Sequence, residues 1–172
     1  MMKQNLILIG FMGAGKTTIG RLFAEKNHLP MVDTDQLIVE KAGMSIPRIF
    51  EQQGEHAFRV LETEVLKQLL IQPGCQVISV GGGLPMREEN RMILSQLGRV
   101  VYLELSEDTV WKRLEGNEDR PLLQGDDAVQ RITTLLSARR PIYELAAHQA
   151  IRVDDKSPEE IVQELERVMG ID

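Results

Sequence analysis

Residues Gly10–Thr17 read GFMGAGKT, a stretch that fits the pattern G-x-x-x-x-G-K-[ST]. An apolar run at Gln4–Ile9 precedes it, and helix-forming residues follow at Lys16–Lys26. A glycine loop between a buried strand and a helix brings backbone amides and the positive end of a helix dipole close to phosphate groups. The stretch therefore predicts a P-loop, in preference to a glycine-rich turn with a solvated lysine.

The individual residues of this loop have separate expected tasks. Lys16 is expected to reach the β- and γ-phosphates of ATP, and the hydroxyl of Thr17 is expected to ligate Mg²⁺. The residues predicted to contact the nucleotide in this segment are Gly13, Ala14, Gly15, Lys16, Thr17 and Thr18.

Outward from the loop, strands and helices are predicted to alternate along the chain. Four further strands are expected at Met31–Val32, Val77–Val80, Val100–Leu105 and Ala150–Val153. Further helices are expected at Asp35–Lys41, Ile46–Gln53, His56–Leu70, Arg87–Gln96, Ser106–Leu114, Ala128–Ala147 and Glu159–Met169. This alternation predicts an α/β fold in which helices cover both faces of a parallel sheet. We expect a single domain over residues 1–172, with a mobile loop at Glu115–Asp127.

Composition excludes several classes of protein. The chain of 172 residues has a net charge of −6, which gives no indication of a nucleic-acid surface. No apolar run approaches the ~20 residues needed to cross a bilayer. The single cysteine, Cys75, excludes an internal disulfide and a zinc cluster, which favours a reducing cytoplasmic setting. We expect a monomer.

Two acidic residues follow the second predicted strand. Asp33 and Asp35 lie two positions apart, so they would point the same way if strand geometry persists. One carboxylate could hold Mg²⁺ through water while the other meets the phosphate acceptor. The alternative for Asp35 is a helix cap. The D-x-x-G and N-K-x-D strings of GTPases do not occur in the sequence.

Scattered arginines and a triple glycine indicate a small anionic acceptor. Gly81–Gly83 end the third strand. Three glycines make folding cost more backbone entropy, so their presence indicates that another group must approach the backbone closely. Arg59, Arg120 and Arg139 are each more often surface residues when taken singly. Together with the glycines they predict a pocket that binds a carboxylate through bidentate guanidinium contacts and covers a phosphate.

In this order the motifs resemble those of the shikimate kinase family, and the resemblance covers nearly the whole chain. It rests on Gly10–Thr17, D-T-D at Asp33–Asp35, G-E-x-x-F-R at Gly54–Arg59, G-G-G at Gly81–Gly83, R-P-L-L at Arg120–Leu123 and R-x-P-x-Y at Arg139–Tyr143. It implies a five-stranded parallel sheet of the nucleoside-monophosphate-kinase type with a mobile lid. It also implies transfer of the γ-phosphate of ATP to the 3-hydroxyl of shikimate, in the pathway to chorismate and the aromatic amino acids.

The resemblance implies roles for residues at both substrates. Lys16 and Thr17 would serve the phosphates and Mg²⁺, with Asp33 holding the water shell of the metal. Asp35 would bind the shikimate hydroxyls and is the candidate base. The lid arginine, Arg120, would reach the transferring phosphate, so the implied catalytic residues are Lys16, Asp35 and Arg120.

The implied binding residues for the acceptor are Arg59 and Arg139, on the carboxylate of shikimate, and Gly81 and Gly82, through backbone contact. Arg140 is the alternative to Arg139, although the spacing to Pro141 and Tyr143 favours Arg139. For the nucleotide, Arg113 aligns with a position that stacks on adenine, and Pro158 falls in the loop that flanks this base.

Three alternatives stay open at this point. A gluconate or nucleotide kinase of the same fold would share the P-loop, although the arginines and triple glycine favour a small hydroxy acid. A regulatory nucleotide-binding module without turnover is disfavoured because Lys16, Thr17, Asp33, Asp35 and Arg120 are all present. A P-loop ATPase that drives a partner is disfavoured by the small size of the chain.

Overall fold

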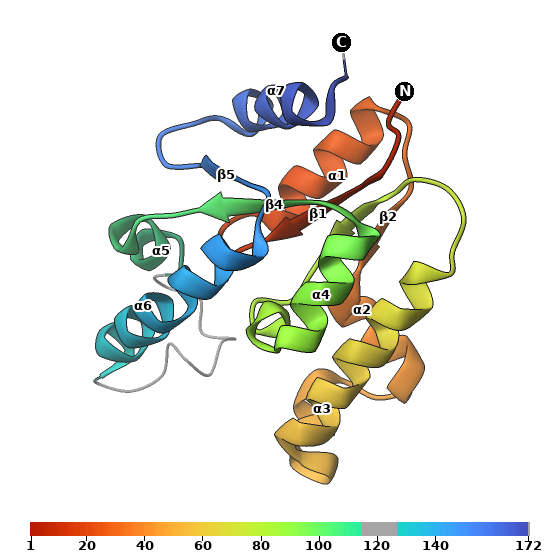
Figure 1. The fold of residues 1–172 in the computed structure, drawn as a ribbon. Coiled ribbons are helices and arrows are strands. Elements are labelled where there is room, and N and C mark those ends of the chain that lie inside the picture. Colours follow the sequence, from red (N-terminus) through yellow and green to blue (C-terminus); the bar gives the residue numbers. More distant parts are fainter. Residues whose placement is uncertain (115–126, 172) are drawn as a thin grey trace.

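The computed structural model describes residues 1–114 and 127–171. In this part of the chain, five parallel strands form one sheet in the order β2-β3-β1-β4-β5 (Figure 1). The strands are β1 (Asn5–Ile9), β2 (Met31–Asp33), β3 (Val77–Ser79), β4 (Gly98–Glu104) and β5 (Gln149–Arg152). The predicted α/β class and the five-stranded parallel sheet are confirmed.

Helices cover both faces of this sheet. α1 and α7 pack against each other on one face, and α4 and α6 lie on the other (Figure 1). The helices of the described part are α1 (Lys16–Lys26), α2 (Thr34–Ala42), α3 (Ile46–Leu70), α4 (Glu88–Leu97), α5 (Glu107–Leu114), α6 (Ala128–Ala146) and α7 (Pro158–Met169), with a 3₁₀ turn, η1 (Leu84–Met86), between β3 and α4.

Two local features differ from the sequence-based expectation. Ile46–Gln53 and His56–Leu70 join into α3, with a kink at Gly54, whose φ of 86° and ψ of 171° are non-helical. The N-cap of α2 is Asp33, whose carboxylate accepts hydrogen bonds from the amides of Asp35 and Gln36. The capping role considered for Asp35 therefore belongs to Asp33, because α2 begins at Thr34, one residue earlier than expected.

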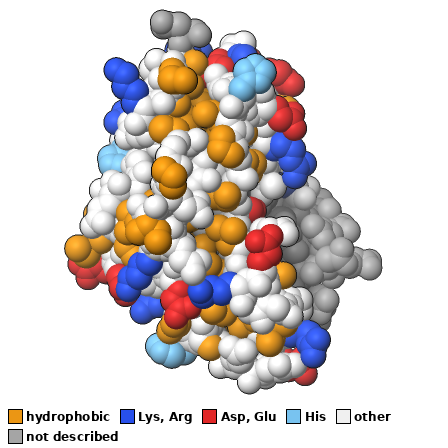
Figure 2. All heavy atoms as spheres, turned by 90° about the vertical axis from the view of Figure 1, so that its right-hand side faces the viewer, with side chains coloured by type: hydrophobic (Ala, Val, Ile, Leu, Met, Phe, Trp, Pro, Cys, Tyr) orange, Lys and Arg blue, Asp and Glu red, His pale blue; other side chains and the backbone are white. Residues whose placement is uncertain are grey.

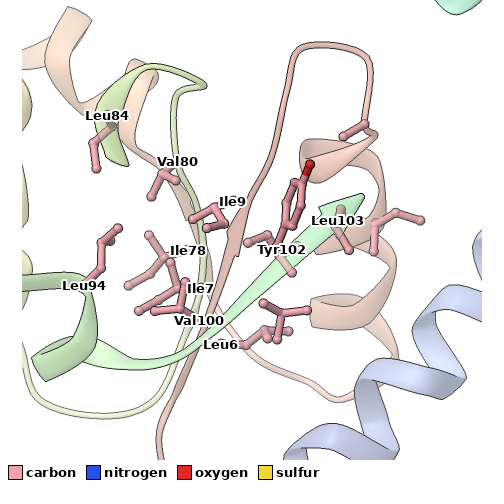
Figure 3. Close-up of a cluster of buried hydrophobic side chains, with 14 of the residues drawn as sticks. Leu6, Ile7, Ile9, Ile78, Val80, Leu84, Leu94, Val100, Tyr102 and Leu103 are labelled. Carbon is pink, nitrogen blue, oxygen red and sulfur yellow. The ribbon is translucent and has the colours of Figure 1, made fainter. Parts of the chain in front are cut away.

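The core lies between the central strands and the helices on either face. Ile7, Ile78 and Val100 come from three adjacent strands, are fully buried and point toward Leu94 of α4 (Figure 3). Near-continuous apolar runs are typical of parallel strands that are covered on both faces. Burying these strands fixes the positions of the loops that follow their carboxyl ends.

One face of the molecule carries charges of both signs. On the face in Figure 2, Lys and Arg side chains are interspersed with Asp and Glu rather than gathered into a stripe. Among the helices that the structure describes, none combines the length and the apolarity needed to span a membrane.

Gly98 shows how tightly the two central strands approach each other. It begins β4 opposite Asn5 of β1, and a methyl group there would lie 2.4 Å from the Asn5 carbonyl oxygen. Because this neighbour is backbone, it cannot swing aside as a flexible side chain can. The missing side chain at Gly98 therefore permits the register between β1 and β4.

We predict that Gly98→Ala lowers the free energy of unfolding by about 2 kcal/mol or more, because the strands must separate locally to admit the methyl group. Urea unfolding followed by circular dichroism measures this change. Gln96→Ala, at an exposed position of α4, is the control and should stay within about 0.5 kcal/mol of the wild type. Equal stability of Gly98→Ala and the control would contradict this packing.

Candidate active site

A cavity of about 380 Å³ opens at the carboxyl ends of β1, β2 and β3. These three strands are neighbours in the sheet, so the loops that leave them meet at one edge. The cavity is lined by Met12, Gly13, Gly15, Lys16, Thr17, Thr18, Asp33, Asp35, Ser79, Val80, Gly81 and Gly82. Most of the predicted nucleotide residues, both aspartates and two of the triple-glycine residues thus share one cavity.

The P-loop has a backbone suited to an anion. Gly10, Gly13 and Gly15 adopt positive φ values of 152°, 81° and 87°, which residues with a side chain rarely adopt. Gly15 begins α1 without a side-chain cap, and the first turn of the helix contains no acidic residue. The first amides of α1 and the positive end of its dipole are therefore available to phosphate oxygens.

Lys16 bends back over this loop. Its Nζ donates hydrogen bonds to the carbonyl oxygens of Gly10, at 2.7 Å, and Phe11, at 3.1 Å. These bonds hold the ammonium group at the cavity that the P-loop also lines. In this position it can interact with the terminal phosphates of a nucleotide.

Thr17 and Asp33 form the oxygen pair that could serve a magnesium ion. The Thr17 hydroxyl lies 3.3 Å from Asp33 Oδ2, while Asp33 Oδ1 is used in capping α2. The described residues hold no group of three or more metal-ligating His, Cys, Asp or Glu side chains. A hydroxyl and one carboxylate fit Mg²⁺, which typically keeps several waters and takes its other ligands from substrate phosphates.

Asp35 is placed by the first turn of α2 and faces the triple glycine. A methyl group at Gly81 would lie 2.7 Å from Asp35 Oδ1. Burial raises the pKa of Asp35 above its usual value, and the charge of Asp33 raises it further, whereas Lys16 and Arg59 oppose the shift. A carboxylate with a raised pKa is a better proton acceptor than a solvated one, as general-base chemistry requires.

The triple glycine approaches a different charged side chain at each position. A methyl group would lie 2.7 Å from Asp35 at Gly81, 3.2 Å from Arg139 at Gly82 and 2.7 Å from Arg59 at Gly83. None of the three glycines adopts a φ in the left-handed region that favours glycine. Close approach, rather than an unusual backbone conformation, is what these glycines provide.

Arg59 is held by an acid that the sequence analysis did not single out. Its NH1 lies 2.7 Å from Glu62 Oε1, and the Glu62 side chain is only 1% exposed. Burial raises the pKa of Glu62 to about 7, although the hydrogen bond and charge of Arg59 oppose this shift. Arg59 and Glu62 lie three positions apart on the predicted helix, a spacing that favours an ion pair. The spacing alone does not predict that the acid is buried.

The structure also separates the two adjacent arginines of α6. The guanidinium of Arg139 lies near Gly82 and 5.8 Å from the centre of the Phe11 ring. Arg140 instead donates to the carbonyl oxygen of Leu105, at 3.2 Å, just past β4. Arg139 is therefore the arginine near the triple glycine.

The remaining predicted residues are Arg113, Pro158 and Arg120. Arg113 donates to the carbonyl oxygen of Gly13 at 2.8 Å, so it reaches the P-loop from α5. Pro158 begins α7, and Asp154, in the preceding turn, accepts hydrogen bonds from Ser106 beside α5. Arg120 and most of the predicted loop at 115–127 lie outside the described residues.

Comparison with known proteins agrees with this arrangement. The family model for shikimate kinase matches residues 12–169. The chain belongs to the shikimate kinase family. It is 43% identical to a shikimate kinase from Sulfurihydrogenibium over 162 residues, which cover 94% of this chain and 95% of that protein. It matches a structure of shikimate kinase from Acinetobacter baumannii in complex with shikimate with a TM-score of 0.88 and 38% identity, over 97% of this chain and 93% of the other.

More distant structures share the fold alone. A gluconokinase from Sinorhizobium meliloti matches with a TM-score of 0.64 at 17% identity, over 98% of this chain and 93% of the other. At this identity the likeness carries no information about the acceptor, so the choice between shikimate and gluconate depends on the family match and on the site itself.

Glu62 makes a testable contribution to the pH dependence of stability. Between its ordinary pKa of 4.5 and the folded value of about 7, the folded protein keeps a proton that the unfolded chain releases. Stability should therefore fall as pH rises through this window, by up to about 3 kcal/mol from this residue.

Urea unfolding of the wild type and of Glu62→Gln at pH 4.5 and at pH 7.5 measures this contribution. We expect the stability advantage of the glutamine variant to grow by about 1–3 kcal/mol from the lower to the higher pH, since glutamine cannot ionise. A difference between the two proteins that is independent of pH would contradict the raised pKa.

Proposed function

We propose that the chain is a shikimate kinase that transfers the γ-phosphate of ATP to the 3-hydroxyl of shikimate, giving shikimate 3-phosphate and ADP. Membership of the family and the similarity to a shikimate-bound structure support this choice. The observation that carries it is the triple glycine, whose three positions approach Asp35, Arg139 and Arg59 in turn. One acid and two guanidiniums close to backbone without side chains suit a ligand with hydroxyls and a carboxylate.

Each substrate would meet its own set of groups. The P-loop amides, Lys16 and the start of α1 would hold the phosphates of ATP, and Thr17 and Asp33 would hold Mg²⁺, which when bound neutralises charge on the phosphate oxygens. Arg59 and Arg139 would hold the shikimate carboxylate by charge-assisted hydrogen bonds. The reacting hydroxyl would then lie on the side of Asp35, which lines the same cavity as Lys16.

Phosphoryl transfer depends on positioning and on positive charge more than on covalent chemistry. Charge spreads over the oxygens of the transferring group, so Lys16 would act where this charge develops. Asp35 would orient the acceptor hydroxyl and accept its proton late in the transfer. The loop at 115–127, with Arg120, would close over both substrates and exclude water that hydrolyses ATP.

Three further predictions from the sequence belong to this proposal: a single domain, a monomeric state and a cytoplasmic location. They rest on chain length, on the single cysteine and on the ordinary composition of the chain.

The function is tested by ADP release from the purified enzyme with ATP, Mg²⁺ and either shikimate, gluconate or AMP. We expect ADP release that depends on shikimate and is far slower with the other two acceptors.

Asp35→Asn should lower kcat by roughly 10²–10⁴, because the amide cannot take the proton. Turnover with gluconate or AMP that matched shikimate would overturn the assignment of the acceptor.

Arg120→Ala tests the predicted lid arginine. We expect kcat to fall by about 10³, since this guanidinium would stabilise charge only in the transition state, with a smaller effect on the KM for shikimate. Steady-state kinetics at saturating ATP separates the two constants. Arg131→Ala removes a different arginine, one paired with Asp127 at the start of α6, and serves as the control. Unchanged kcat in Arg120→Ala would remove the lid role.

A further inference from the structure

Hydrogen bonds orient the peptide groups of the triple glycine. The Gly81 amide donates to Thr34 Oγ1, at 3.0 Å, and the Gly81 carbonyl accepts from the Leu84 amide, at 3.1 Å. The Gly83 carbonyl accepts from the Met86 amide, at 3.1 Å. The Gly82–Gly83 peptide is oriented differently, because its carbonyl accepts from the Tyr143 hydroxyl of α6, at 2.7 Å.

Tyr143 belongs to the helix turn that also carries Arg139. Its side chain is fully buried, and its hydroxyl oxygen is within hydrogen-bonding reach of Arg139 as well. Both Tyr143 Oη and Arg139 NH1 lie within 3.5 Å of the place where a side chain at Gly82 would begin. Burial raises the pKa of Tyr143 to about 12. The hydroxyl therefore stays a donor at neutral pH.

The orientation of one peptide bond determines where its amide points. In a trans peptide the N–H and the C=O point in opposite directions, so fixing the Gly82 carbonyl fixes the Gly83 amide. Within residues 1–114 and 127–171, the amides of Gly82 and Gly83 donate to no protein acceptor. Gly82 lines the cavity beside Arg139, and Gly83 is buried beside Arg59. Amides without a protein acceptor that lie next to guanidinium groups are suited to an anionic ligand.

We propose that Tyr143 is a positioning residue for the carboxylate of the acceptor. Its hydroxyl holds the Gly82–Gly83 peptide and the Arg139 guanidinium in one arrangement, so that a backbone amide and two arginines address the same carboxylate. The inference rests on the proposed function, and it assigns to this tyrosine a task beyond packing.

A second tyrosine in the same cluster provides a matched control. The ring of Tyr102 lies 5.1 Å from that of Tyr143, and both side chains are buried. In the described part of the chain, the Tyr102 hydroxyl has no hydrogen-bond partner. Replacing either residue with phenylalanine removes one buried oxygen, but only Tyr143→Phe releases the Gly82 carbonyl.

The test compares Tyr143→Phe and Tyr102→Phe in steady-state kinetics with shikimate and with shikimate methyl ester, which lacks the negative charge. We expect Tyr143→Phe to raise the KM for shikimate about five- to tenfold, the size of one lost hydrogen bond. The KM for ATP should stay unchanged, and the preference for the acid over the ester should fall. Tyr102→Phe should match the wild type in every constant.

Several outcomes would overturn the proposal. An unchanged KM for shikimate in Tyr143→Phe, an equal rise in the KM for ATP, or an unaltered preference for the acid would each do so. Failure of Tyr143→Phe to fold would also do so, since phenylalanine keeps the packed ring and the proposal assigns only the hydroxyl to the acceptor site. A wild type inactive on shikimate would instead refute the proposed function itself, which separates the two failures.

Discussion

Close approach between backbone and charged groups at one edge of the sheet is the constraint on which this site depends. At the end of β1, glycines with positive φ let amides gather where Lys16 bends over the loop. At the end of β3, the missing side chains of Gly81–Gly83 leave room for one carboxylate and two guanidiniums. Adjacent strands thus supply two neighbouring surfaces, one suited to phosphates and one suited to a small acid.

Burial sets the electrostatics of the second surface. Arg59 is paired with Glu62, an almost fully buried acid whose pKa is raised to about 7. A pair of this kind holds the guanidinium in place, and burial disfavours the charged form of the acid. Burial, together with the charge of Asp33, also raises the pKa of Asp35, which suits the base proposed for the acceptor hydroxyl.

Local patterns predicted much of this structure, and packing determined the rest. The helix over Lys16–Lys26 and all five strands follow from apolar periodicity and glycine placement, so they could be predicted from neighbouring residues alone. The partnership of Glu62 could not, because an acid in an amphipathic helix is usually solvated. Nor could the sequence distinguish glycines needed for positive φ, as at Gly13, from those needed for space, as at Gly82.

The central claim is that one acid and two arginines address a single acceptor molecule beside the P-loop. A crystal structure of the enzyme with ADP, Mg²⁺ and shikimate tests it most directly. We expect the shikimate carboxylate between Arg59 and Arg139, within hydrogen-bonding distance of the triple-glycine backbone, and a hydroxyl against Asp35. Shikimate bound away from Gly81–Gly83, or arginines turned to solvent in that complex, would contradict it.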